Sequence, residues 1–177
     1  MKRGKGGFLI LLCIIWVAVI LGLAAQGGED SHSLSYNVTW MIGSILHPDF
    51  SSWSLSVQTD WVSGIESLIR KLAHFSEFAL LGALAFFSLH EILKNRKGRK
   101  PYQPVKSAFL AFYLCAAIAM LSEMLQIYAD NRTASTLDVL LDCFGVICGI
   151  MVSYVWVKHH GSAKSAEEAP VSHRRKG

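Results

Sequence analysis

Three short groups of polar residues in this chain have types and spacings that suit acid–base or phosphate-binding chemistry. Arginine and lysine bind phosphate oxygens, and arginine can do so through two parallel hydrogen bonds. A histidine beside carboxylates can act as an acid–base pair or bind a divalent metal. The candidate site residues are Arg70, Lys71, His74, Glu77, Glu123, Gln126, Arg132, Asp138 and Asp142. Apolar segments adjoin all three groups, so these segments must hold the site together.

The first two groups have spacings that place their members on one face of a helix. Arg70, His74 and Glu77 stand at positions i, i+4 and i+7, whereas Glu123 and Gln126 stand at i and i+3. Ionisable groups at the end of an apolar helix are costly when they face lipid. We therefore expect both stripes to face neighbouring helices.

The third group continues into a pair of glycines. Asp138, Asp142, Gly145 and Gly149 follow one another at intervals of four, three and four residues, so they share a helix face. Small residues allow membrane helices to approach one another closely. We predict that Gly145 and Gly149 pack against another helix, beneath an acidic outer end.

The segments that position these groups are apolar enough to cross a membrane. The 177 residues are 52% hydrophobic, with a mean hydropathy of +0.36, and a helix crosses about 30 Å of hydrocarbon in about 20 residues. We predict an all-α membrane protein with spans at about 8–25, 72–93, 107–128 and 137–157. The first could instead be a signal peptide, but its apolar run exceeds the ~7–15 residues of that class, so a retained helix is favoured.

The basic residues predict the orientation of the spans, because lysine and arginine in short loops stay on the cytoplasmic side. Fourteen of the 17 fall at the N-terminus, in the loop after the second span and in the C-terminal tail. They are Lys2, Arg3, Lys5, Lys94, Arg96, Lys97, Arg99, Lys100, Lys106, Lys158, Lys164, Arg174, Arg175 and Lys176. Both termini are therefore expected in the cytoplasm, with two loops outside. The net charge of +4 reflects this topology and does not indicate nucleic acid binding.

This orientation places the three polar groups at one level of the outer leaflet. The span 72–93 starts at the outer surface, 107–128 ends there, and 137–157 starts there again. Glu77 then lies only about 5 Å inside the hydrocarbon. We expect a shared outer site and not a site at the membrane midplane.

The segment between the first two spans is more than a linker. Apolar residues recur at helical spacing on both sides of Pro48, which predicts a short interfacial helix, a turn at 47–49 and a second amphipathic stretch that leads into the second span. The first pattern comprises Leu34, Val38, Met41, Ile42 and Ile45, and the second comprises Trp61, Val62, Ile65, Leu68, Ile69 and Leu72. The alternative is a partly disordered loop. Residues 159–177 are polar and are expected to form a disordered cytoplasmic tail.

The cysteines do not indicate a further site. Cys13, Cys115, Cys143 and Cys148 all fall inside predicted spans and lack metal-ligand spacing, so we interpret them as small core residues without disulfides. We expect no metal and no cofactor.

Together these motifs resemble the VanZ-like family of small bacterial membrane proteins, whose founding member is associated with resistance to the glycopeptide teicoplanin. The resemblance covers residues 69–149. It depends on Arg70-Lys71-x-x-His74-Phe-x-Glu77, on Glu123-x-x-Gln126, on Arg132, and on Asp138-x-x-x-Asp142-x-x-Gly145-x-x-x-Gly149. The resemblance implies action at the outer membrane surface, where peptidoglycan precursors are presented and lipophilic glycopeptides partition.

Asp142 departs from the family pattern, which usually has asparagine at this position. An amide can donate a hydrogen bond, whereas an ionised carboxylate can only accept one. A role implied by the family therefore does not transfer directly to Asp142.

Three functions fit these residues. In the first, the protein binds a lipid-linked wall precursor, a lipoglycopeptide or an anionic lipid headgroup. Arg70, Lys71 and Arg132 would then contact phosphate, Glu77, Glu123 and Asp138 would orient those cations, and Gln126 would contact sugar or peptide. Such binding would link the protein to teicoplanin resistance or envelope maintenance.

In the second, a membrane-embedded enzyme acts on a lipid-linked substrate through His74 and the nearby carboxylates, although no HExxH or other hydrolase motif is present. In the third, the charges pair with one another only to close the end of the bundle. A transporter is less well supported, because the polar groups are shallow and no inverted repeat is visible.

Overall fold

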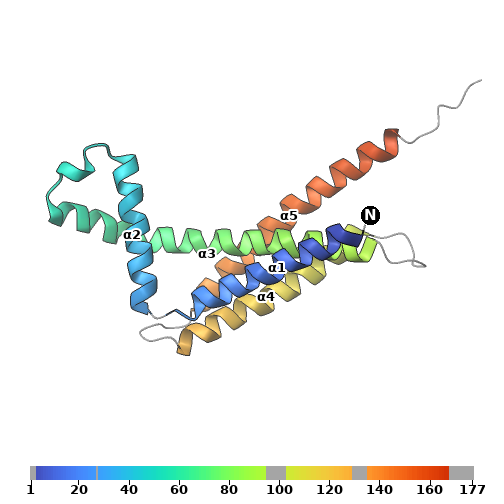
Figure 1. Ribbon diagram of the computed structural model, residues 1–177, viewed down its shortest axis with the longest axis horizontal. Coiled ribbons are helices and arrows are strands. Elements are labelled where there is room, and N and C mark those ends of the chain that lie inside the picture. The colour runs from blue at the N-terminus through green and yellow to red at the C-terminus, as the bar shows by residue number, and fades with distance from the viewer. Residues whose placement is uncertain (1–2, 27, 95–102, 129–134, 168–177) are drawn as a thin grey trace, which may run out of the picture.

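The computed structural model describes residues 3–26, 28–94, 103–128 and 135–167, and the regular structure within them is helical (Figure 1). The elements are α1 (Arg3–Ala24), α2 (Gly28–Leu46), the 3-10 turn η1 (Phe50–Ser52), α3 (Leu55–Lys94), α4 (Pro104–Tyr128) and α5 (Thr136–Glu167). Arg132 lies outside the described residues.

Four of these helices are long and apolar enough to cross a membrane. They cover Gly6–Ala24, Leu55–Lys94, Pro104–Tyr128 and Thr136–His160. The predicted all-α fold with four spans is confirmed. The side of the membrane on which the termini lie stays a prediction from the basic residues.

The segment between the first two spans is helical, as the apolar spacing predicts. The helix α2 runs across α3, and a short connection containing η1 returns the chain to the start of α3 (Figure 1). The alternative of a partly disordered loop is wrong for the described residues of this segment. One feature differs from the prediction, because the second amphipathic stretch and the second span form a single helix of 40 residues. At 1.5 Å per residue α3 is about 60 Å long, twice the thickness of the hydrocarbon.

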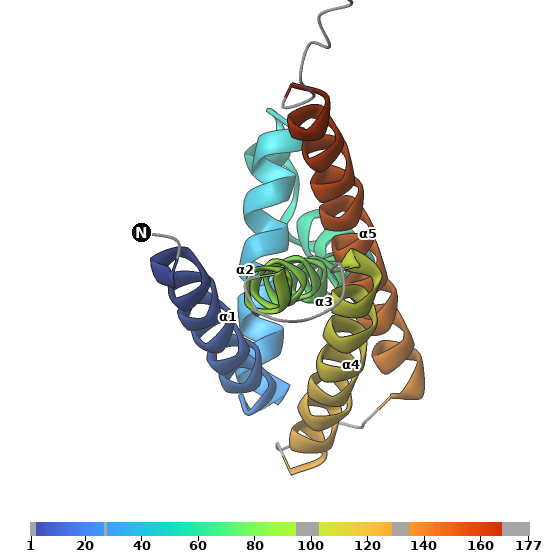
Figure 2. The same cartoon turned by 90° about the vertical axis from the view of Figure 1, so that its right-hand side faces the viewer.

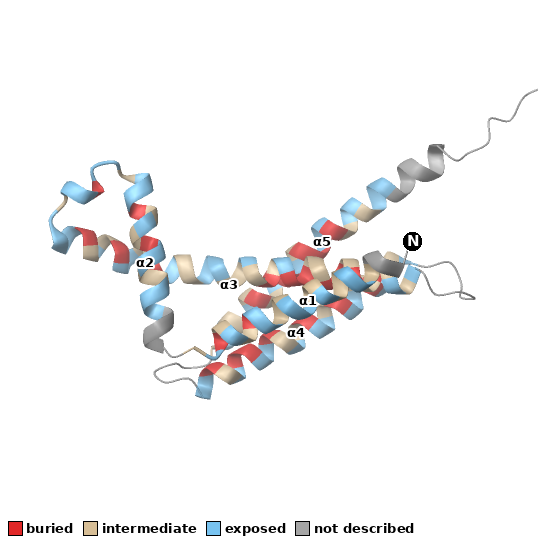
Figure 3. Ribbon diagram, viewed as in Figure 1, coloured by how far each residue is buried: buried red, intermediate tan, exposed pale blue. Residues whose placement is uncertain are grey.

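The core of the bundle surrounds the second half of α3. Figure 2 looks along α3 and shows α1 on one side of it and α4 and α5 on the other. The buried apolar residues gather on the facing sides of these helices (Figure 3). They are Ile20 of α1; Phe78, Leu81, Ala85 and Phe86 of α3; Ala111, Cys115 and Ala119 of α4; and Val146 and Ile150 of α5. The outward faces keep large exposed side chains such as Tyr113 and Val152, which suits contact with lipid.

Glycines bring the backbones of α3 and α5 into direct contact. A Cβ added at Gly145 would overlap the carbonyl of Phe75, and one at Gly149 would overlap the carbonyl of Ala79. From the other side, a Cβ at Gly82 would lie 2.5 Å from a carbonyl oxygen of α5. At these three glycine positions the crossing has no room for a side chain.

The C-terminal part of the chain requires a correction. The helix α5 continues through Glu167, so residues 159–167 are helical and not disordered. Polar composition alone suggested disorder, but these residues extend a helix that is already nucleated and need only to propagate it. Residues 168–177 lie outside the described part of the chain.

Candidate functional site

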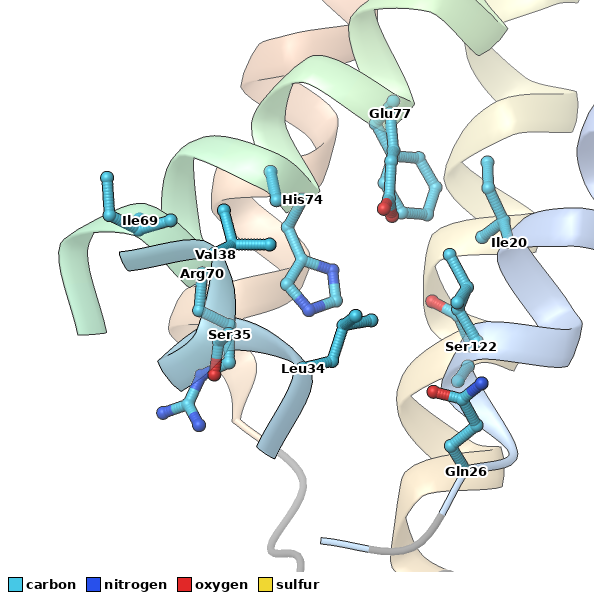
Figure 4. Close-up of a pocket in the computed structure, with 14 residues that line it drawn as sticks. Ile20, Gln26, Leu34, Ser35, Val38, Ile69, Arg70, His74, Glu77 and Ser122 are labelled. Atoms are coloured by element: carbon cyan, nitrogen blue, oxygen red, sulfur yellow. The ribbon is translucent and has the colours of Figure 1, made fainter. Parts of the chain in front are cut away.

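A cavity of about 160 Å³ lies where α1, α2, α3 and α4 meet (Figure 4). Its lining residues are Ile20, Leu23, Ala24, Gln26, Leu34, Ser35, Val38, Ile69, Arg70, Ala73, His74, Glu77, Phe78 and Ser122. The walls from α1 and α2 are mainly apolar, whereas α3 contributes the ionisable groups. A water molecule occupies about 30 Å³ in the liquid, so the cavity has room for a small polar group or a short piece of hydrocarbon.

The charged stripe of α3 forms one side of this cavity. Arg70, His74 and Glu77 all line it, as their helical spacing requires. His74 and Glu77 point into the space between α3 and the opposite wall, and the guanidinium of Arg70 lies at the edge beside Ser35 (Figure 4). Lys71 follows Arg70 in the chain but is exposed and does not line the cavity.

Asp142 lies behind His74, inside the bundle. Its side chain is 1% exposed, and its Oδ1 is 4.0 Å from Nδ1 of His74. Neither carboxylate oxygen has a hydrogen-bond partner among the described residues. A buried charge without hydrogen bonds is strongly unfavourable, so this position requires a bound proton or a nearby cation. His74 therefore stands between the cavity and a buried acid.

The acidic group of α4 lies on the same side of the bundle. Glu123 is buried, and its Oε2 accepts a hydrogen bond of 2.9 Å from the backbone N–H of Ser135, just before α5 begins. A carboxylate at a helix N-terminus is favourable, so this contact anchors α5 against α4. Gln126, one turn further along, is buried, and its Nε2 has no hydrogen-bond partner in residues 3–26, 28–94, 103–128 and 135–167.

Asp138 precedes Asp142 by four residues, on the same face of α5. Asp138 is half-buried at the start of α5, above Asp142. Within the part of the chain that the structure describes, no three histidine, cysteine, aspartate or glutamate side chains are arranged to hold a metal ion.

The structure thus groups the predicted residues in two layers. Arg70, His74 and Glu77 form the cavity layer. Asp142, Glu123 and Gln126 form a buried layer beside it. Gly145 and Gly149 lie deeper, at the crossing with α3. The contribution of Arg132 stays a prediction.

Glu66 is a functional candidate that the sequence analysis did not single out. It is buried, and its Oε1 accepts a hydrogen bond of 2.5 Å from Ser35 Oγ, while its Oε2 lies 3.2 Å from Nε2 of His32. These contacts hold α2, and with it one wall of the cavity, against α3. The sequence did contain a signal for Glu66, because it precedes Arg70 by four residues and extends the helix stripe of Arg70, His74 and Glu77.

Trp16 is a second residue that sequence reasoning passed over. Its indole N–H donates a hydrogen bond of 2.9 Å to the backbone carbonyl of Glu77. The bond fixes α1, which supplies another wall of the cavity, to the part of α3 that carries the charged stripe. No sequence signal pointed to this contact, because Trp16 is one apolar residue within an apolar run.

The chemistry available is that of an amphiphile site with an acid–base pair beside it. A guanidinium at the rim and apolar side chains on the walls suit a molecule with an anionic head and a hydrocarbon part. The pair of His74 and Asp142 can hold or transfer a proton at the inner surface of the cavity.

Comparison with known proteins shows which family the chain is similar to. A protein-family model described as VanZ/LLP1 matches residues 8–157, which includes most of the first and last spans, the two spans between them and both layers of the site. No curated protein and no solved structure matches the chain.

Proposed function

We propose that this chain, which belongs to the VanZ/LLP1 family of multi-span membrane proteins, binds the anionic head of a membrane lipid in the cavity between α1, α2, α3 and α4. The ligand class includes lipid-linked cell-wall precursors and anionic phospholipids. The observation that carries the proposal is a cavity with apolar walls and a cationic rim at one end of the bundle. Resistance to teicoplanin or maintenance of the envelope would follow from occupancy of this cavity.

The polar side of the cavity supports recognition of phosphate. Arg70 lies at its edge, where a phosphate or pyrophosphate could accept two parallel hydrogen bonds. Ser35 adds a neutral polar group beside it, and Gln26 adds one on the opposite side of the cavity (Figure 4). Glu77 on the same stripe limits how far an anion can enter, so the head would stay at the rim, near Arg70.

The apolar side supports a ligand that arrives from the bilayer. Leu34 and Val38 of α2 both line the cavity and are 52% and 37% exposed. The same stripe continues along α2 through Met41 and Ile45, which are also exposed. An apolar helix face of this kind suits the boundary between headgroups and acyl chains. A lipid could then reach the cavity sideways, with its chain kept in hydrocarbon.

The unpaired groups favour a binding site over a bundle whose charges merely pair with one another. The carboxylate of Asp142 and the amide nitrogen of Gln126 are buried, and neither has a hydrogen-bond partner within the part of the chain that the structure describes. Native proteins leave few such atoms, and those present need a physical explanation. A site that exchanges protons or receives a ligand supplies one.

The test compares lipid binding by variants of two adjacent cationic residues, Arg70 and Lys71. Purified protein in nanodiscs would be incubated with a radiolabelled undecaprenyl-linked peptidoglycan precursor, and with labelled phosphatidylglycerol and phosphatidylcholine. Arg70→Ala is expected to lower retention of the anionic lipids about tenfold or more, because a charge-assisted contact is worth about 1.5–3 kcal/mol. Which of the two anionic lipids is retained more strongly identifies the ligand source.

Lys71→Ala is the matched control, since it removes a neighbouring charge that does not line the cavity. Both variants would be scored in a bacterial host for protein abundance and teicoplanin susceptibility. The proposal predicts loss of phenotype at normal abundance for Arg70→Ala alone. Equal retention of anionic lipid by wild type, Arg70→Ala and Lys71→Ala would refute it.

A second candidate function is acid–base catalysis on the bound lipid. The observation in its favour is the 4.0 Å approach of His74 to a carboxylate that has no hydrogen-bond partner among the residues described. Asp142→Asn removes the acid and keeps the shape of the side chain. If the protein is an enzyme of this type, Asp142→Asn abolishes conversion of the retained precursor while leaving its retention intact. Unaltered precursor recovered from the wild-type protein would contradict catalysis and leave the binding function in place.

A further inference from the structure

A second, separate cavity lies on the lipid-facing side of the bundle. It is an open groove of about 440 Å³ between α4 and α5. The lining residues are Val105, Ala108, Phe109, Phe112, Ile147, Ile150, Met151, Tyr154 and Val155. Phe109, Met151 and Val155 are each more than half exposed, so no described part of the chain covers the groove.

The dimensions of the groove match one leaflet. Along α4 it extends from Val105 to Phe112, about 10 Å, and along α5 from Ile147 to Val155, about 12 Å. Half of a ~30 Å hydrocarbon core is about 15 Å. A groove of this length can take most of an acyl chain from one leaflet, whereas a packed partner helix would normally continue across both.

Positive charge marks one end of the groove. Lys106 follows the lining residue Val105 and stands three residues before Phe109. Lys158 stands four residues after Tyr154 and three after Val155, so helical spacing places it on the groove side of α5. Both lysines are exposed.

The tyrosine at this end also suits a headgroup boundary. Tyr154 is half-buried, and its ring packs edge-on against Phe86 with the ring centres 6.3 Å apart. Tyrosine combines an apolar ring with a polar hydroxyl, which suits the boundary between headgroups and acyl chains. Two lysines and one tyrosine therefore lie near the same end of an apolar groove.

We propose that this groove binds an anionic phospholipid, with one acyl chain between α4 and α5 and the phosphate near Lys106 and Lys158. The choice of occupant follows from charge complementarity and length. Basic sites between spans recognise anionic headgroups on the side where lysine and arginine gather, and each such cation adds appreciable affinity. The site is independent of the cavity that contains Arg70, and it lies in the opposite, predicted cytoplasmic leaflet.

The experiment uses full-length protein that carries Arg70→Ala, so that lipid bound in the cavity lined by Arg70 does not dominate the measurement. Native mass spectrometry would follow competition between phosphatidylglycerol and phosphatidylcholine of identical chains. Phosphatidylglycerol is expected to remain bound preferentially. Adding Lys106→Ala and Lys158→Ala is expected to reduce that preference about tenfold, whereas Lys106→Arg and Lys158→Arg should retain it.

A second pair of variants tests the apolar part. Ala108→Phe places a ring in the groove and should reduce binding of phosphatidylglycerol at least fivefold, whereas Ala117→Phe adds the same ring at an exposed position of α4 outside the groove. Unchanged lipid preference after removal of both lysines would overturn the proposal. Retention of the lipid by Ala108→Phe, or a wild-type dimer that this variant dissociates, would also overturn it.

Discussion

The helix α3 makes two contacts of opposite character within a few turns. At its crossing with α5, Gly82, Gly145 and Gly149 allow backbone to touch backbone. About two turns before Gly82, and next to the Phe75 carbonyl that Gly145 touches, His74 faces a cavity on one side and the buried carboxylate of Asp142 on the other. The same helix is thus tightly packed along its crossing with α5, the tight level, and hollow beside that crossing, the hollow level.

The difference separates what holds this protein together from what it can bind. A glycine contact gains dispersion energy and close approach but has no donor, acceptor or space to offer a ligand. The hollow level has space, and beside it lie buried polar groups that have no hydrogen-bond partner among the described residues and so are costly. A rigid crossing beside a costly cavity is the arrangement expected when a fold supports a site.

The largest effect should come from filling the tight level. Gly149→Ala would drive a methyl group into the carbonyl of Ala79, and we expect a loss of about 3 kcal/mol or more. Since about 1 kcal/mol shifts Tm by roughly 2–4 °C in a chain of this size, a detergent melting curve should fall by at least about 6 °C.

Gly64→Ala on α3 is the matched control for this loss. A Cβ there meets nothing within 4 Å, and alanine favours the helix by up to about 1 kcal/mol. If Gly149→Ala melted at the same temperature as the wild type, the tight packing at this crossing would not stabilise the protein as we expect.

A moderate effect should come from releasing the wall of the cavity. Glu66→Ala removes the acceptor for Ser35 and the partner of His32, and we expect a cost of about 2 kcal/mol confined to α2. Hydrogen exchange should speed up in α2 and stay unchanged in α5. Asp60→Ala removes an exposed acid of α3, the helix that carries Glu66, and should change hydrogen exchange in neither α2 nor α5. Uniformly faster exchange in all helices would indicate that α2 is not a separate wall.

The sequence predicted the tight level more completely than the hollow one. Helical spacing and small residues specified the face of α5 that carries Gly145 and Gly149, because packing in membranes follows directly from residue size. The spans followed from apolar length. Spacing alone did not settle whether α3 would be continuous from Leu55 to Lys94. No proline or glycine turn separates the amphipathic pattern from the apolar span, which favours one helix, but the change of pattern favours two segments.

The sequence predicted which helix faces carry the polar residues, but it did not predict the cavity that they form. Stripes on three helices placed Arg70, His74 and Glu123 near one another in depth, but not which of them would line a cavity. That division depends on α2 and on the hydrogen bond from Trp16, neither of which a polar motif reveals. Depth from the membrane surface also cannot distinguish a half-buried Asp138 from a fully buried Asp142 one turn away.

The smallest effect concerns the far end of the segment between the first two spans. A hydrogen bond from the indole N–H of Trp53 holds the pKa of Asp49 below its ordinary value. A lowered pKa contributes stability that is present above the unfolded pKa of about 3.9 and is lost as the pH falls through the folded pKa. The indole proton of Trp53 should therefore shift by NMR only below about pH 4, and Asp49→Asn should remove the shift. A transition near neutral pH would contradict this assignment.

The central claim is that the hollow level receives a lipid head, and covalent labelling tests it most directly. A polyprenyl diphosphate with a photoreactive diazirine beside the diphosphate would be crosslinked to the protein in nanodiscs, and the labelled peptides would be mapped. We expect labels on residues 69–77 of α3 and 34–38 of α2, which excess unlabelled diphosphate abolishes. Labels spread over lipid-facing residues such as Tyr113 and Val152, with no effect of competitor, would contradict the account.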